Sequence, residues 1–93
     1  ILGQAVTASS DGEVVYAGNG LSGFGQLVIL KHNDVFLSAY GYNETIQVDS
    51  GDLVKQGQQI ATMGLGPTKS PQLYFEIRQS GDPIDPMRVI PSI

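Results

Sequence analysis

The sequence contains no cysteine, and it has only one histidine among its 93 residues. Without cysteine, neither a disulfide nor a thiolate metal site can form. Basic residues are also few: five lysines and arginines are scattered along the chain, and the formal net charge is −4. Because no basic run is present to attract phosphate, we expect no nucleic-acid partner.

Long apolar runs are missing as well. A membrane-spanning helix needs a run of roughly 18 or more apolar residues, and no run here approaches that length. We therefore expect no membrane contact by this segment. The chain begins at Ile1 in the middle of a pattern, without a methionine or a signal peptide. We expect it to be the C-terminal part of a longer protein, with any export signal, lipid anchor or coiled coil upstream.

What the sequence does contain is typical of a small β-protein. Hydrophobic residues make up 41% of the chain and charged residues 15%, alongside 12 glycines and 5 prolines. This composition predicts one globular domain over residues 1–93. Runs rich in Val, Ile, Tyr and Phe predict short strands between tight turns, and no segment keeps a helical period. Strands are expected at 4–8, 13–18, 26–32, 35–40, 45–48, 59–64 and 72–78. The fold class is therefore all-β, a small antiparallel β-sandwich or open barrel.

The run at 72–78 shows the alternation of a half-buried strand. Leu73, Phe75 and Ile77 share one face and are predicted to point into the core. The residues between them belong to the opposite face, where a binding site would lie.

Residues suited to catalysis are scarce. Hydrolytic zinc requires about three protein ligands and an open position for water. The single histidine, His32, stands in no H-x-H, H-x-x-x-H or H-x-x-x-D spacing. Our interpretation is that His32 caps a hairpin beside Asn33 and Asp34. No G-x-S-x-G motif surrounds any serine, so the residues by themselves predict neither catalysis nor a cofactor.

Two longer motifs carry a family resemblance. The segments "SGDLVKQGQQIATMG" at 50–64 and "LYFEIRQSGDPIDP" at 73–86 resemble the LytM domain of the lysostaphin-like zinc endopeptidases, which cleave peptidoglycan. The resemblance extends from Gly12 to Pro86. It implies the LytM fold of the duplicated-hybrid-motif type, of which this chain would lack the N-terminal part.

The chain departs from the active members of that family at the catalytic positions. Active members carry an H-x-H before the Phe-Glu pair, and those two positions correspond here to Gln72 and Tyr74. A further catalytic histidine corresponds to Tyr42 in "YGYN". The family's other zinc ligands come from an H-x-x-x-D that would lie upstream of Ile1. Because tyrosine and glutamine are poor zinc ligands, the resemblance implies a chain that is not an enzyme and holds no metal.

The same departures are similar to those of the degenerate LytM proteins of Gram-negative bacteria, the NlpD and EnvC families of murein hydrolase activators. Those proteins switch on periplasmic N-acetylmuramoyl-L-alanine amidases during daughter-cell separation. The segments "YGYN" and "LYFEIR" are EnvC-like, whereas "KHNDVFLSAY" and "IATMG" are NlpD-like, so both resemblances stay open. They imply a non-catalytic periplasmic activator that promotes septal peptidoglycan splitting, with an amidase as partner and peptidoglycan as a further candidate.

The degenerate groove is the expected partner-binding surface. Tyrosine replaces a metal ligand by a large, stiff amphipathic ring of the kind enriched at protein interfaces. We expect Tyr42, Gln72 and Tyr74 to line this surface, with Leu65 and Lys69 on its rim.

Three other functions remain as alternatives. The first is an active zinc-dependent peptidoglycan endopeptidase that uses ligands outside this sequence. The second is a peptidoglycan-binding module without signalling to an enzyme. The third is a carrier domain, because "VDSGDLVKQGQQIATM" is similar to half of a biotinyl or lipoyl domain. The chain lacks the modifiable lysine of such domains, so the carrier ranks last.

Overall fold

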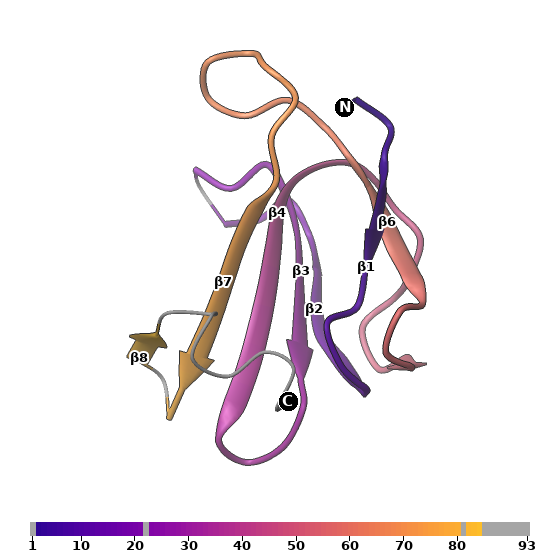
Figure 1. The fold of residues 1–93 in the computed structure, drawn as a ribbon, viewed down its shortest axis with the longest axis vertical. Helices are drawn as coiled ribbons and strands as arrows, with labels where there is room; N and C mark the ends of the chain where they lie inside the picture. The colour runs from indigo at the N-terminus through magenta and orange to yellow at the C-terminus, as the bar shows by residue number, and fades with distance from the viewer. Residues whose placement is uncertain (1, 22, 81, 85–93) are drawn as a thin grey trace.

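The computed structural model describes residues 2–21, 23–80 and 82–84 and consists, over these residues, of eight β-strands (Figure 1). They are β1 (Ala5–Thr7), β2 (Gly12–Gly18), β3 (Gln26–Lys31), β4 (Phe36–Ile46), β5 (Leu53–Val54), β6 (Gln59–Met63), β7 (Tyr74–Gln79) and β8 (Asp82–Ile84). All pairings are antiparallel and form one sheet in the order β1-β6-β4-β3-β2-β5, with β7 on β4 and β8 on β7. The all-β prediction is confirmed, as a single curled sheet. No helix long and apolar enough to cross a membrane occurs over these ranges.

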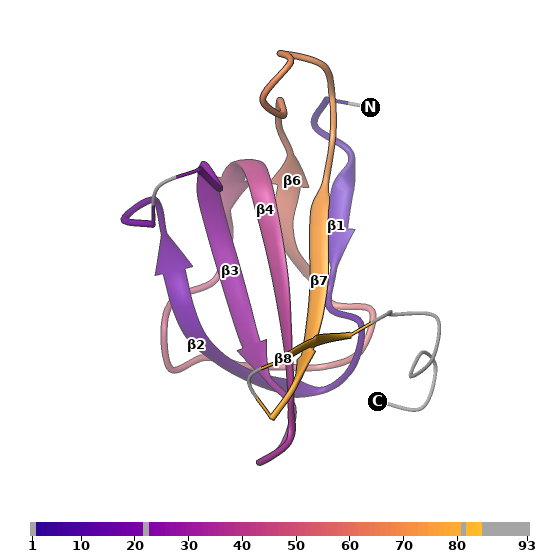
Figure 2. The same cartoon turned by 90° about the vertical axis from the view of Figure 1, so that its left-hand side faces the viewer.

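Strand β4 organises the sheet. One edge of β4 pairs with β3, while the other edge pairs with β7 over 36–41 and with β6 over 43–46 (Figures 1 and 2). The prediction of separate strands at 35–40 and 45–48 is wrong, because one strand of 11 residues runs from Phe36 to Ile46. Register shifts beside Tyr42 let β4 turn from one partner to the other. Such an irregularity interrupts the two-residue alternation of a strand, so the sequence pattern predicts a gap between two strands.

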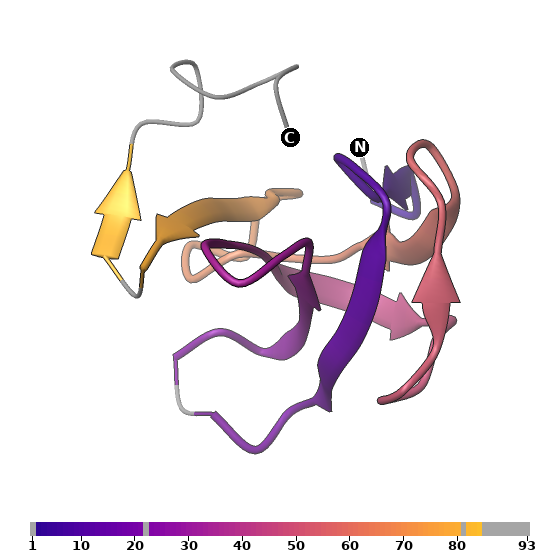
Figure 3. The same ribbon diagram turned by 90° about the horizontal axis from the view of Figure 1, so that it is seen from below.

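The core lies inside the curl, which Figure 3 shows from below. Its fully buried side chains come from most strands and include Val14, Val28, Leu30, Tyr40, Ile60 and Ile77. The predicted register of 72–78 is confirmed: Ile77 is fully buried, and Leu73 and Phe75 pack against the core while remaining half-buried. The Phe75 ring lies 5.4 Å from the Tyr40 ring, centroid to centroid.

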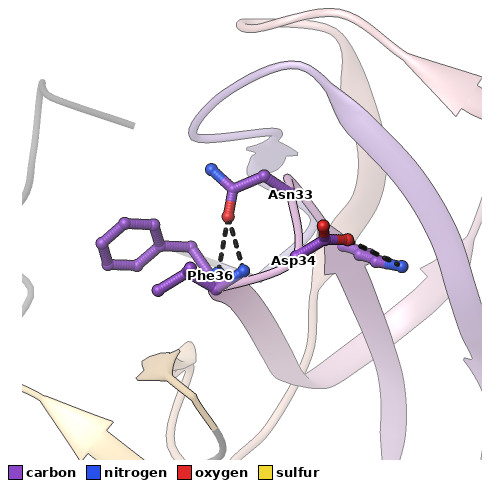
Figure 4. A network of polar contacts seen from close by, with 5 residues as sticks. Asn33, Asp34 and Phe36 are labelled. Atoms are coloured by element: carbon purple, nitrogen blue, oxygen red, sulfur yellow. Dashed lines mark hydrogen bonds and ion pairs between the residues drawn. The ribbon is translucent and has the colours of Figure 1, made fainter.

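The β3–β4 hairpin is closed by Asn33, as Figure 4 shows. The Asn33 Oδ1 atom accepts hydrogen bonds from the backbone N–H groups of Val35 and Phe36, at 2.8 and 2.9 Å. His32 therefore closes the hairpin only through its backbone N–H, which donates to the Phe36 carbonyl at 3.0 Å, and the interpretation of His32 as the cap is wrong for its side chain. A short asparagine oxygen reaches the N–H groups of its own turn, whereas the His32 ring reaches across to Asp11 on a neighbouring segment.

A hydrogen-bonded chain runs from His32 into the core. The His32 Nδ1 atom donates to the backbone oxygen of Asp11, and Nε2 lies 2.7 Å from the Ser38 hydroxyl. Ser38 is bonded in turn to the Tyr40 hydroxyl at 2.8 Å, and Tyr40 to Ser9 at 2.9 Å. The buried polar atoms of Ser38 and Tyr40 are thereby satisfied, as burial requires. Both ring nitrogens of His32 have structural partners.

Candidate functional site

Tyr42 sits at the point where β4 changes partner. Its φ of 61° lies in the left-handed region, which is strained for a bulky side chain. Two hydrogen bonds of 2.8 Å hold it there: the Tyr42 N–H donates to the Phe24 carbonyl, and the Tyr42 carbonyl accepts from the Gly64 N–H. Strain of this kind persists only where surrounding contacts determine the backbone. The loops on both sides of β4 therefore fix the position of Tyr42.

Tyr42 belongs to a cluster of three aromatic rings. The Tyr74 ring packs edge-on against the Phe24 ring, with centroids 5.1 Å apart, and against the Tyr42 ring at 6.0 Å. Gly41 makes the close approach possible, because a Cβ atom there would lie 3.1 Å from the Tyr74 Cβ and 3.3 Å from the Phe24 oxygen. Two predicted site residues are thus in contact. Phe24, from the β2–β3 loop, is a third member that the sequence pattern did not predict.

Tyr74 begins a polar row along the outer face of β7. Its hydroxyl donates to Glu76 Oε2, and Arg78 Nε donates to Glu76 Oε1. The hydrogen bond to Glu76 is the main cause that raises the pKa of Tyr74 above its ordinary value, with desolvation adding to it. Desolvation of Glu76 favours its neutral form, but the hydrogen bonds from Tyr74 and Arg78 outweigh this effect and lower the pKa of Glu76.

The phenol of Tyr74 is therefore expected to ionise at a pH above 10.0, the ordinary tyrosine value. Because its raised pKa favours the neutral form, the contribution of the Tyr74–Glu76 bond to stability is complete below that value and is lost as the pH rises through the pKa of Tyr74. Alkaline titration of the tyrosinate absorbance checks this, with Tyr74→Phe identifying the signal among four tyrosines. Glu76→Gln should shift the Tyr74 transition toward lower pH, and an unshifted transition would contradict the assigned cause.

The polar row borders a cavity of about 290 Å³ on the outer face of the sheet. Its lining is mostly apolar and consists of Leu21, Phe24, Leu27, Ile29, Leu37, Ser38, Ala39, Tyr74, Glu76 and Arg78. We call this set the outer groove. The sequence of β3 indicates this groove. Four consecutive residues of "QLVILK" are apolar, which is typical of a strand with apolar residues on both faces.

The remaining predicted residues lie on the β6–β7 loop, which projects beyond the sheet in Figure 1. Leu65 is exposed and pairs with Pro71 at the base of this loop. The Gln72 side chain lies over Gly66, where a Cβ would meet Gln72 Oε1 at 2.2 Å. Lys69 is exposed beyond them and has a φ of 62°. The structure thus places Leu65, Lys69 and Gln72 on the loop and only Tyr74 of the predicted residues in the lining of the outer groove.

A larger cavity of about 460 Å³ lies at the turn side of β2 and β3, lined by nine residues including Asp11, His32, Leu53 and Lys55. None of the predicted site residues lines it. The polar atoms of His32 and Asp11 in this cavity already form hydrogen bonds within the protein. His32 Nδ1 donates to the Asp11 backbone oxygen, and Asp11 Oδ1 accepts from the Gln56 N–H at 2.7 Å. The outer groove is therefore the stronger candidate despite its smaller volume.

The residues that the family resemblance places at zinc-binding and catalytic positions do not fit that metal. Within residues 2–21, 23–80 and 82–84, no three His, Cys, Asp or Glu side chains come together. A phenol binds a metal as its anion, but the Tyr74 hydroxyl donates its proton to Glu76 and its pKa is raised. The Gln72 side chain lies over Gly66. The site offers aromatic surface where zinc coordination would require free donor atoms.

The sequence pattern of Peptidase family M23 matches residues 2–86. Murein hydrolase activator NlpD of Escherichia coli is 54% identical over 89 residues, which are 96% of this chain and 24% of that protein. Lipoprotein NlpD/LppB homolog of Pseudomonas aeruginosa is 53% identical over 97% of this chain and 30% of that protein. Both relatives are NlpD proteins, which favours the NlpD-like resemblance.

A solved structure shows the same fold. The catalytic domain of lysostaphin from Staphylococcus simulans superposes with a TM-score of 0.87 at 31% identity, covering 97% of this chain and 72% of that one. The chain spans between about a quarter and a third of the length of the two curated relatives.

Proposed function

This chain belongs to peptidase family M23, and we propose that it is a LytM domain that activates a murein hydrolase without cleaving peptidoglycan itself. The hydrolase class we propose is the periplasmic N-acetylmuramoyl-L-alanine amidases, which act in septal splitting and daughter-cell separation. The names of the relatives support this role, since one is a murein hydrolase activator and the other a lipoprotein, as expected in a cell envelope.

The observation that carries the proposal is the aromatic cluster of Phe24, Tyr42 and Tyr74. Tyr42 and Tyr74 stand where the family resemblance places catalytic and zinc-binding histidines. Rigid aromatic rings bury large contact area at low entropic cost and are enriched at the energetic centres of interfaces. The cluster is therefore suited to holding a protein partner and unsuited to generating a zinc-bound hydroxide.

The chemistry of the outer groove also favours a protein partner over a glycan. Its lining is mostly apolar, and its volume of about 290 Å³ is near the lower end for ligand pockets. Such a groove accepts one or two apolar side chains, with the Glu76–Arg78 ion pair at its edge. The sugar rings and peptide stems of peptidoglycan present mostly polar groups, so they would cover this apolar surface less completely than apolar protein side chains.

A dye-release assay on labelled peptidoglycan sacculi tests the proposal. We expect no release by the chain alone, with or without added zinc, and increased release when an NlpD-dependent amidase is present. Leu53→Ala, an exposed position outside the outer groove, is a matched control that should activate like the wild type. Zinc-dependent release by the chain alone would restore the endopeptidase, and binding to sacculi without any activation would favour the peptidoglycan-binding module.

A further inference from the structure

The loop between β2 and β3 contains an Asn-Gly pair that does not line the outer groove. Asn19 and Gly20 are both exposed, in the glycine-rich stretch "GNGLSGFG". No hydrogen bond of the Asn19 side chain occurs among the described residues. Asn-Gly is the dipeptide in which the following backbone nitrogen approaches the asparagine amide most freely, because glycine has no Cβ to obstruct it.

One tyrosine lies directly over this pair. The Gly20 N–H donates to the Tyr16 hydroxyl at 2.7 Å. The same hydroxyl oxygen lies 3.0 Å from where a Cβ of Gly20 would be and 3.6 Å from where a Cβ of Gly18 would be. Because neither glycine has a Cβ atom, the Tyr16 phenol fits into the space beside them. Its hydroxyl accepts a hydrogen bond from the Gly20 nitrogen, the atom that can approach the Asn19 side-chain amide.

We propose that Asn19 is a site of spontaneous deamidation through a succinimide, and that Tyr16 restrains the reaction by holding the Gly20 N–H. In the first step the Gly20 nitrogen loses its proton to hydroxide and bonds to the Asn19 side-chain carbonyl carbon. The C–N bond of the amide then breaks, and the leaving nitrogen departs with added protons as ammonia. Water opens the five-membered imide at either carbonyl, which yields aspartate or isoaspartate at position 19.

The restraint follows from the hydrogen bond itself. A nitrogen whose N–H donates to Tyr16 must give up that bond before it can lose its proton and turn toward the Asn19 side chain. The reaction therefore proceeds through local opening of the loop, as hydrogen exchange does in exposed segments. The product carries one more negative charge than the unmodified chain, whose formal net charge is −4. Isoaspartate also lengthens the backbone of the β2–β3 loop, and this loop holds the Phe24 ring against the Tyr74 ring.

Peptide mapping by mass spectrometry during incubation of the folded chain at mildly alkaline pH tests this. We expect slow conversion at Asn19 in the wild type and about fivefold faster conversion in Tyr16→Phe. This is the change in rate that corresponds to the net free energy of one hydrogen bond between neutral groups. Asn19→Gln, which would have to form a six-membered ring, should show none at this position. The same chain unfolded in urea provides the unrestrained rate.

Hydrogen exchange at the Gly20 amide gives a second readout on the same samples. Its exchange should be slower in the wild type than in Tyr16→Phe, with circular dichroism confirming that both are folded. Equal conversion rates in the two folded proteins would overturn the restraint by Tyr16. Conversion in urea with none in either folded protein would overturn Asn19 as a site in the native chain.

Discussion

Replacing Tyr74 with alanine is expected to weaken binding of the chain to the proposed amidase partner by about thirtyfold, or ~2 kcal/mol, as for an aromatic residue central to an interface. The ring lies at the end of the outer groove and contacts both Phe24 and Tyr42, so its loss removes the centre of the cluster. Tyr42→Ala should have a similar effect, because alanine at φ 61° keeps the same backbone strain and removes only the ring. Titration of the amidase, with the melting temperature of each variant, is the measurement.

Two controls separate docking from folding. Tyr74→Phe keeps the ring and removes only the bond to Glu76, so most of the affinity should remain. Leu53→Ala removes an apolar side chain that is 81% exposed and lies outside the outer groove, so its affinity should be unchanged. If both tyrosine-to-alanine variants melt at lower temperature but bind normally, the rings merely fill space. If both are folded and bind normally, the docking surface lies elsewhere, and the 64–73 loop with Leu65 and Lys69 is the next candidate.

Replacing Ile77 with alanine is expected to lower the free energy of unfolding by about 2–5 kcal/mol, the usual range when a buried isoleucine is truncated. Ile77 has no exposed surface and comes from β7, the strand that also carries Tyr74. A domain of this size has a total stability of roughly 5–15 kcal/mol, and its melting temperature should fall by about 10 °C or more. Urea unfolding followed by circular dichroism measures the change.

The exposed neighbour on the same strand provides the comparison. Gln79→Ala lies two residues beyond Ile77 on a solvent-exposed part of β7, and surface substitutions of this kind usually change stability by no more than about 0.5 kcal/mol. Phe75→Ala should fall between the two because Phe75 is only half-buried. A melting temperature unchanged in Ile77→Ala would contradict the register of β7, which also places Tyr74 on the outer face.

The sequence alone determined the fold class and the orientation of β7. Alternation of Leu73, Phe75 and Ile77 follows directly from the two-residue period of a strand, and the structure places these side chains toward the core. The family was also readable, because motifs at 50–64 and 73–86 are local in the chain. The short strands β5 and β8 were not predicted, since two or three residues show no period by themselves. Strand β1 is equally short, but it lies within the longer β-rich run at 4–8.

Only the tertiary structure decided how the candidate site is assembled. Phe24 is 50 residues from Tyr74 in the chain, and their contact depends on the bend of β4 at Tyr42. That bend is held by backbone hydrogen bonds from two loops, which no local pattern encodes. The same holds for His32: its partner Asp11 is 21 residues away, so proximity in sequence suggested a hairpin cap. Sequence patterns record which face a residue occupies, whereas the curl of the sheet determines which residues of that face meet.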